Sequence, residues 1–110
     1  MKIAVILKSG PFTAEADRGL QSTADMLSQG HSVHVYMLQD AVNFCRPDIK
    51  DTSFEDMNRL IDEKLKVHVL IEDAELRGID ADSMSPSVVR GDYESLVELM
   101  ESADRVMGLL

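Results

Sequence analysis

Short runs of apolar residues alternate along this chain with longer stretches in which apolar residues recur at every third or fourth position. The first run, residues 2–7 (KIAVIL), is too short for a helix and almost continuously apolar, as expected of a parallel strand that is covered on both faces. The longer stretches have the spacing of helices that bury one face. We therefore predict an α/β fold: a three-layer α/β/α sandwich built on a mainly parallel sheet of about five strands.

The boundaries of these elements follow from the same patterns and from turn and capping residues. Strands are expected at residues 2–7, 33–38, 67–71, 87–89 and 106–110. Helical faces are expected at residues 12–27, 54–65 and 96–103. The helices are framed by Thr13, Gly30 and Asp92, and by a capping-box pattern at residues 52–55 (TSFE). Residues 40–53 are expected to be mostly loop, and the strand order stays open because a flavodoxin-like sheet has the same alternation.

Composition limits the partners and the compartment that suit the chain. Its 110 residues are enough for one domain, residues 1–110, and leave no room for a second. Twenty acidic residues against eleven basic ones give a net charge of −9, which repels nucleic-acid phosphates and anionic membranes. No apolar stretch approaches the roughly 18 residues of a membrane span, and no signal-like leader precedes the first strand. Because Cys45 is the only cysteine, no intrachain disulfide can form, and we expect a cytoplasmic protein without nucleic-acid or membrane partners.

A candidate ligand site lies where the expected strands end. Ligands of open α/β sheets collect beyond the carboxyl ends of the strands, where backbone N–H groups of the following turns face outward. In residues 67–80 (VHVLIEDAELRGID) the apolar run stops abruptly at two acids, and a loop at residues 8–11 follows the first strand. The residues expected to line this pocket are Ser9, Gly10, Pro11, Glu72, Asp73 and Arg77.

Glu72 and Asp73 have two interpretations. They can act as a general acid and base if one of them is desolvated and its pKa rises beside the other. Alternatively, one of them caps the next helical turn, where a carboxylate meets free N–H groups; we favour this role because it needs no further assumption. Arg77 can bind an anion, but an ion pair with Glu72, Asp73 or Glu75 on its own helical turn is the expected role.

Four segments carry a further pattern that spans most of the chain. They are the Gly10-Pro11 loop, residues 30–42 (GHSVHVYMLQDAV), residues 77–79 (RGI) and residues 103–106 (ADRV). In this order they resemble the DsrE-like sulfur-relay family. The resemblance implies a three-layer α/β/α domain that forms homo-oligomers, trimers or hexamers, or assembles with related family subunits. It also implies a sulfur-accepting cysteine near Glu72 and Asp73, which would hold a persulfide and pass its sulfur to a partner.

This chain departs from the family pattern at the position of that cysteine. Residues 71–78 contain no cysteine, and a carboxylate cannot form a persulfide. We therefore expect a non-enzymatic small-ligand-binding or partner subunit in intracellular sulfur handling. One alternative is a sulfur carrier or sulfurtransferase with Cys45 as the persulfide site, Arg46 favouring its thiolate and a sulfur-carrier protein as partner, although a cysteine is often simply buried as a small hydrophobe. The other alternative is an acid/base enzyme that uses Glu72 and Asp73.

No cofactor or metal is expected. The G-x-G-x-x-G pattern and the Walker lysine motif of nucleotide-binding loops are both missing. His31, His34 and His68 invite a metal interpretation, because histidines on neighbouring strands can meet. No closely spaced His, Cys or Asp ligand motif accompanies them, so a hydrogen bond in the core or at a subunit contact is the expected role.

Overall fold

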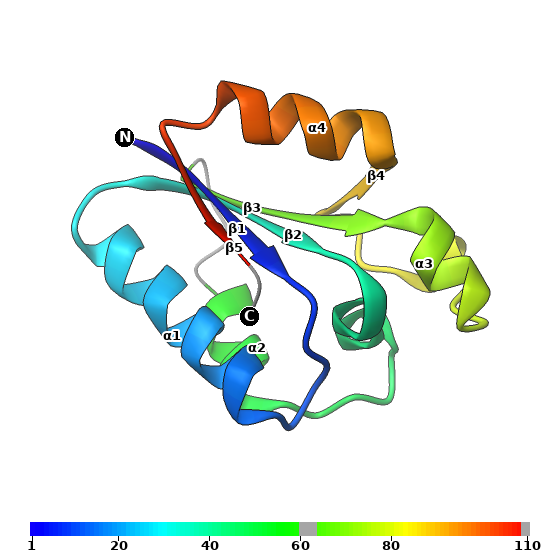
Figure 1. Ribbon diagram of the computed structural model, residues 1–110. Coiled ribbons are helices and arrows are strands. Elements are labelled where there is room, and N and C mark those ends of the chain that lie inside the picture. Colours follow the sequence, from blue (N-terminus) through cyan, green and yellow to red (C-terminus); the bar gives the residue numbers. More distant parts are fainter. Residues whose placement is uncertain (60–63, 109–110) are drawn as a thin grey trace.

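The computed structural model describes residues 1–59 and 64–108, which form a parallel sheet between two layers of helices (Figure 1). The strands are β1 (Lys2–Leu7), β2 (Ser32–Met37), β3 (Leu65–Leu70), β4 (Val88–Gly91) and β5 (Arg105–Gly108). The helices are α1 (Ala14–Ser28), α2 (Thr52–Asn58), α3 (Ile71–Leu76) and α4 (Tyr93–Ser102), with the 3-10 helices η1 (Gln39–Cys45) and η2 (Ala81–Ser83). The predicted α/β/α class is confirmed.

The strand order explains how the helices are divided between the two faces. All strand pairs are parallel, in the order β4-β3-β2-β1-β5, which differs from the flavodoxin-like order 2-1-3-4-5. Figure 1 places α1 and α2 on one face and α4 on the other. Because β4 and β5 lie at opposite edges, the connection through α4 has to cross the whole sheet. This single helix therefore covers part of the second face.

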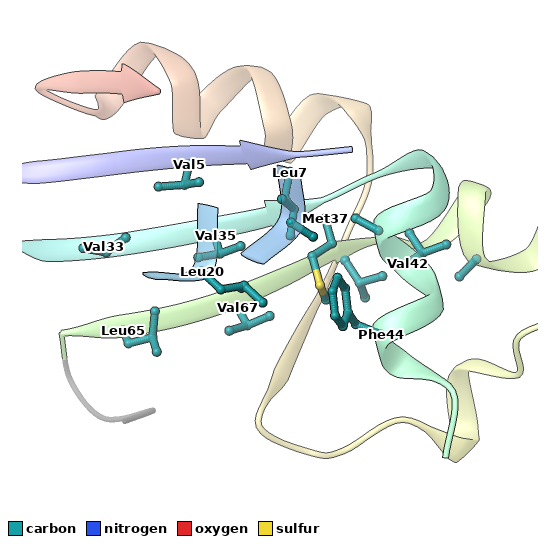
Figure 2. Close-up of a cluster of buried hydrophobic side chains, with 14 of the residues drawn as sticks. Val5, Leu7, Leu20, Val33, Val35, Met37, Val42, Phe44, Leu65 and Val67 are labelled. Atoms are coloured by element: carbon teal, nitrogen blue, oxygen red, sulfur yellow. The ribbon is translucent and has the colours of Figure 1, made fainter. Parts of the chain in front are cut away.

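The larger core lies between the sheet and the layer of α1 and α2 (Figure 2). Alternate residues of the three central strands point into it, as the pleat of a strand requires. These residues are Ile3, Val5, Leu7, Val33, Val35, Met37, Leu65, Val67 and Val69. Leu20 of α1 and Phe44 of η1 pack against them. The almost continuous apolar runs of the strands are explained because their other residues face the second helical layer.

A smaller core lies under α4. Ala4, Ile6, Tyr36 and Leu70 of the sheet pack there with Leu99 of the helix. The Tyr36 hydroxyl donates to the carbonyl oxygen of Asp92 at 2.8 Å, which gives this fully buried side chain a hydrogen-bond acceptor. The second face is thus apolar near α4 and polar beyond it.

The segment expected to be mostly loop, residues 40–53, is partly helical. Its first half belongs to η1, in which Ala41, Val42 and Phe44 are buried. These side chains close the larger core at the carboxyl ends of the strands. The loop prediction was wrong here because tertiary burial of three apolar residues stabilises a short 3-10 helix.

The second helix is shorter than its apolar pattern predicted. Helix α2 ends at Asn58, while Leu60 and Ile61 lie outside the described residues. Leu65, predicted to be the last apolar residue of this helix, opens β3 and pairs with Val33 of β2. Its backbone joins the sheet ladder, which overrides the helical spacing.

The remaining strand boundaries shift by small amounts. Ile71, predicted to end the third strand, is the first residue of α3. The fourth strand occupies Val88–Gly91 rather than residues 87–89. The last strand begins at Arg105, one residue before its predicted start, and residues 109–110 lie outside the described residues.

The capping-box pattern at residues 52–55 is displaced by one residue. Thr52 is already inside α2, and Asp51 supplies the cap: its Oδ1 accepts from the Phe54 N–H at 3.1 Å. The other oxygen, Oδ2, accepts from the N–H of Phe12 at 2.9 Å. Phe12 has a φ of 65°, in the left-handed region that a bulky residue rarely adopts. The buried Asp51 therefore ties the start of α2 to the loop before α1.

The other framing residues are confirmed. Thr13 accepts from the Ala16 N–H at 3.2 Å through its hydroxyl, and Gly30 follows α1 with a φ of 91°. Asp92 accepts from the Ser95 N–H at 2.8 Å, and the Ser95 hydroxyl accepts from the Asp92 N–H at 3.0 Å. The last pair is a capping box, with serine in the position usually taken by Glu or Gln.

We expect Thr13→Ala to lower the free energy of unfolding by about 1 kcal/mol, the usual cost of losing an N-cap side chain. The hydroxyl of Thr13 also donates to the Gly10 carbonyl at 2.8 Å, so the loop before α1 loses a tether as well. Urea unfolding followed by circular dichroism measures the effect. Thr13→Ser keeps the hydroxyl and should stay near wild type; equal losses in both variants would contradict this role.

Candidate functional site

The carboxyl ends of β1, β2 and β3 meet at one edge of the sheet, where η1 and α3 begin (Figure 1). The loop after β1 packs against η1: the Lys8 carbonyl accepts from the Ala41 N–H at 3.2 Å. Gly10 is buried, and a Cβ there would lie 3.1 Å from the carbonyl oxygen of Asp40. A larger residue would push this loop away from η1. The backbone of Gly10 therefore approaches Asp40 closely, while the flanking Ser9 and Pro11 stay partly exposed.

Asp73 links the end of β3 to the end of β2. Its side chain is buried, and its Oδ2 accepts from the N–H of Gln39 at 2.6 Å. Gln39 has a φ of 51°, so the first residue of η1 is held in a left-handed conformation. A charge-assisted hydrogen bond to this N–H stabilises that conformation. Asp73 is thus a structural tether between two strand ends.

The prediction that Glu72 or Asp73 caps α3 was wrong. Leu70 is the N-cap residue, and its side chain makes no cap hydrogen bond. The helix begins directly after the strand, so no turn residue is available to cap it. The carboxylates of Glu72 and Asp73 lie in its first turn, where the helix dipole favours negative charge.

Arg77 forms an ion pair, although with a different acid from those predicted. Its Nη2 donates to Asp40 Oδ1 at 3.1 Å and its Nη1 donates to the Asp73 carbonyl oxygen at 3.2 Å. The carboxylates on its own helical turn do not form this ion pair, because η1 places Asp40, which follows β2, next to Arg77. Arg46 donates to the Arg77 carbonyl at 2.7 Å, which adds a further link between η1 and α3.

The two acids of the candidate acid/base pair lie in different surroundings. Glu72 is exposed and, with Glu75 and Leu76, lines an open hollow of about 350 Å³. Asp73 is buried and committed to Gln39. The chemistry of a shared proton needs both carboxylates in one environment. This arrangement favours a scaffold role for Asp73 and leaves Glu72 as a surface acid.

Cys45 lies at the end of η1 and borders a separate cavity of about 350 Å³. The other residues that line this cavity are Phe44, Arg46, Pro47, Ile49, Phe54, Glu55, Ser83, Ser85 and Val88. Burial raises the pKa of the Cys45 thiol to about 11, so the thiol is protonated at neutral pH. Burial is the cause of this shift, and the Nε and Nη2 donors of Arg46 are bonded to Asn43 at 2.8 Å and to the Arg77 carbonyl. Of the predicted pocket residues that the structure describes, none lines this cavity.

The structure brings two of the three histidines together. The Nδ1 of His34 and the Nε2 of His68 lie 2.9 Å apart, so these rings share a hydrogen bond. The ring of His68 also stacks on Tyr36, with ring centres 5.4 Å apart. Within the described ranges, no group of three or more His, Cys, Asp or Glu residues is placed to hold a metal.

Lowering the pH below about 6.5 is expected to lower the free energy of unfolding. Burial lowers the pKa of His68 from 6.5 to about 4, as do the charges of His34, Lys2 and Lys66; burial also lowers the pKa of His34. The unfolded chain therefore binds protons more tightly than the folded one. The stability that comes from the neutral pair is complete above pH 6.5 and is lost as the pH falls toward about 4.

Urea unfolding at a series of pH values measures this dependence. His68→Gln should have a smaller pH slope than wild type, whereas His31→Gln, outside the pair, serves as the matched control. A His68→Gln variant with the wild-type slope would contradict the prediction.

Sequence reasoning missed Asp40, Gln39 and Asp51 as organising residues of this edge. The available signal was the polar pair Gln39-Asp40. It directly follows the predicted second strand, as Glu72 and Asp73 follow the third. Parallel strands bring such residues to one edge. Asp51 gave a weaker signal, because its contact with Phe12 depends on how α1 and α2 pack.

These elements define a class: a parallel α/β domain with its candidate site at the carboxyl edge and two edge strands joined over one face by a single helix. A sequence model of the family described as DsrH like protein matches residues 13–106, so the chain belongs to the DsrH-like family. The expected relationship to DsrE-like sulfur-relay proteins is thereby confirmed. Among curated proteins, none is significantly similar in sequence.

Two solved structures have the same fold. The ychN protein from E. coli superposes with a TM-score of 0.87 at 18% identity, over 99% of this chain and 99% of that chain. MTH1491 from Methanobacterium thermoautotrophicum, described as a protein of unknown function, superposes with a TM-score of 0.73 at 12% identity, over 97% and 98% of the two chains. No helix in the described part of the chain is long and apolar enough to cross a membrane.

Proposed function

We propose that this chain is a non-enzymatic partner or small-ligand-binding subunit in intracellular, cytoplasmic sulfur handling. The single observation that carries this proposal is the state of the edge after β3. Where the family resemblance places a sulfur-accepting cysteine, this chain has an exposed Glu72 and a buried Asp73 that holds the Gln39 N–H. Neither carboxylate can hold sulfur covalently. A tether in place of a nucleophile supports a binding role.

The surroundings of Cys45 argue against the rival role of sulfur carrier. A persulfide forms when a thiolate attacks a sulfur donor, and burial raises the pKa of this thiol to about 11. Arg46 is engaged elsewhere. The cavity beside Cys45 combines apolar residues with Arg46, Glu55, Ser83 and Ser85, a kind of lining that suits a small ligand.

The outer side of α4 supports a subunit contact. Tyr93, Val97 and Met100 recur at helical spacing and are 51%, 51% and 43% exposed, respectively. Glu94 and Glu101 lie one turn before and after Val97 on the helix surface. A contact with an apolar strip rimmed by basic residues would suit this surface, in a homo-oligomer or with related family subunits.

Sulfur loading tests the catalytic part of the proposal. The protein is incubated with a polysulfide donor, and the intact mass is followed before and after addition of a thiol acceptor. We expect no transferable gain of one sulfur atom, and the same result in Cys45→Ser. A sulfur adduct on Cys45 that passes to the acceptor, and that is lost in Cys45→Ser, would overturn the proposal.

Light scattering tests the subunit contact. We expect assembly of the chain, alone or with related family subunits, and its loss in Val97→Glu. Glu98→Gln on the same helix is the matched control and should assemble normally. A wild-type monomer that also fails to bind related subunits would contradict the partner role.

A further inference from the structure

A cluster of basic side chains lies on the sheet face that α4 covers only in part. His34 of β2 and His68 of β3 are half-buried and hydrogen-bonded, with ring centres 5.2 Å apart. Lys66 of β3 is the register partner of His34. Lys2 of β1 is near enough to both imidazoles to lower their affinity for protons, as is Lys66. Two lysines and two histidines thus gather in a protein whose net charge is −9.

Among the residues that the structure describes, neither Lys2 nor Lys66 forms an ion pair with an acid. From α4, the Ser102 hydroxyl accepts from Lys2 Nζ at 2.8 Å. Asp104, at the start of β5, accepts from the backbone N–H of Lys2 at 2.8 Å. Tyr36 directs its hydroxyl away, to the Asp92 carbonyl. Within residues 1–59 and 64–108, Asp104 is the one acid that bonds directly to these four residues, and it bonds to the backbone of Lys2 and not to its ammonium group.

The hydrogen bond between the rings fixes how protons can be arranged. In the neutral pair, one of the facing nitrogens donates and the other accepts. The outer nitrogens, His34 Nε2 and His68 Nδ1, therefore present one N–H and one lone pair. When the pair takes up one proton, both outer nitrogens become donors. A bound anion would favour this protonated state, whereas the lysines oppose it when no anion is present.

We propose that Lys2, His34, Lys66 and His68 form a binding site for a small tetrahedral oxyanion of the sulfate or phosphate class, and that the histidine pair takes up a proton as the anion binds. The two ammonium groups supply attraction, and the protonated pair supplies N–H donors. A metal cation suits this place less well. The lysines repel it, and the described residues add no third ligand of the usual kind. This site is independent of the sulfur-handling role proposed above.

Inorganic sulfate is the first probe, because its charge stays constant over the pH range in which the histidines titrate. Sulfate is added at pH 6 and at constant ionic strength while the imidazole resonances of the intact protein are followed by NMR. We expect saturable shifts for His34 and His68 and none for His31. Phosphate should compete for the same shifts.

Variants separate a built site from general screening of charge. Lys66 is exposed, so Lys66→Gln should keep the fold and weaken sulfate binding roughly three- to tenfold. Lys50→Gln is the matched control. It removes an exposed lysine from the segment just before α2 and should leave the affinity for sulfate unchanged. Backbone amide spectra check that both variants fold. Equal affinity in Lys66→Gln and wild type would overturn the proposal.

Proton uptake provides a second readout. Calorimetry in two buffers with different ionisation enthalpies should show that close to one proton enters per bound sulfate, and affinity should fall as the pH rises from 6 to 8. Non-saturable drifts, binding without proton uptake, or a saturable response to Zn²⁺ in place of sulfate would each overturn the proposal.

Discussion

We expect Cys45 of the folded protein to react with iodoacetamide about a hundredfold more slowly at neutral pH than an unperturbed cysteine does. Burial raises the pKa of its thiol from 9.0 to about 11, and two pKa units reduce the thiolate fraction by about a hundredfold. The reacting species is the thiolate, so the rate should follow this fraction and rise about tenfold per pH unit through the alkaline range. Mass spectrometry of quenched time points measures it.

Unfolding provides the control for this prediction. In concentrated urea the same thiol should react like a free cysteine, because the burial that raises its pKa is gone. Arg46→Ala should not slow the native reaction, because burial is the cause of the raised pKa of the thiol and the guanidinium is bonded to Asn43 and to the Arg77 carbonyl. A native rate equal to the unfolded rate would restore Cys45 as a candidate sulfur acceptor.

Replacing Asp73 with Ala is expected to lower the free energy of unfolding by about 2 kcal/mol, the scale of one hydrogen bond to a charged group. Asp73 is 8% exposed and its carboxylate accepts from the Gln39 N–H at 2.6 Å, so its loss leaves η1 without this anchor. Gln39 would then keep a left-handed φ without compensation. Urea unfolding gives the free energy, and hydrogen exchange at the Gln39 amide reports the local opening.

Glu72→Ala is the matched control for Asp73→Ala. It removes an acid from the same helical turn, but an exposed one, and should change stability by less than about 0.5 kcal/mol. Asp73→Asn keeps an oxygen acceptor without the charge and should fall between the two. If Asp73→Ala and Glu72→Ala lowered the free energy of unfolding equally, Asp73 would act only as a negative charge in the first turn of α3 and not as a tether.

The fold was predictable where burial on both faces makes the sequence continuously apolar. Residues 2–7 read as a strand because Ile3, Val5 and Leu7 face one helical layer while Ala4 and Ile6 face the other. The secondary structure was predicted wrongly at residues where tertiary contacts outweigh the local sequence pattern. Leu65 has the spacing of a helix residue but pairs with Val33 in the sheet.

The site was predictable in its location and not in its contacts. The polar residues after β1 and β3 do lie at one edge, as parallel strands require. Which acid meets Arg77, and that Asp73 reaches Gln39, depends on how η1 sits over the strand ends. The positions of Ala41 and Phe44, three residues apart, were the weak local signal for that helix. The histidine pair needed the β2–β3 register, which no local pattern contains.

The pairing of β1 with β5 determines when the sheet can be completed. The N–H of Lys2 donates to Asp104, a contact that spans 102 residues, and Ala4 stands opposite Val106. Contacts of such high sequence separation slow folding, because a long loop must close before they form. On the ribosome, one side of the interior strand β1 therefore stays unpaired until β5 has emerged. During that interval the open edge of β1 is exposed to strand-to-strand aggregation.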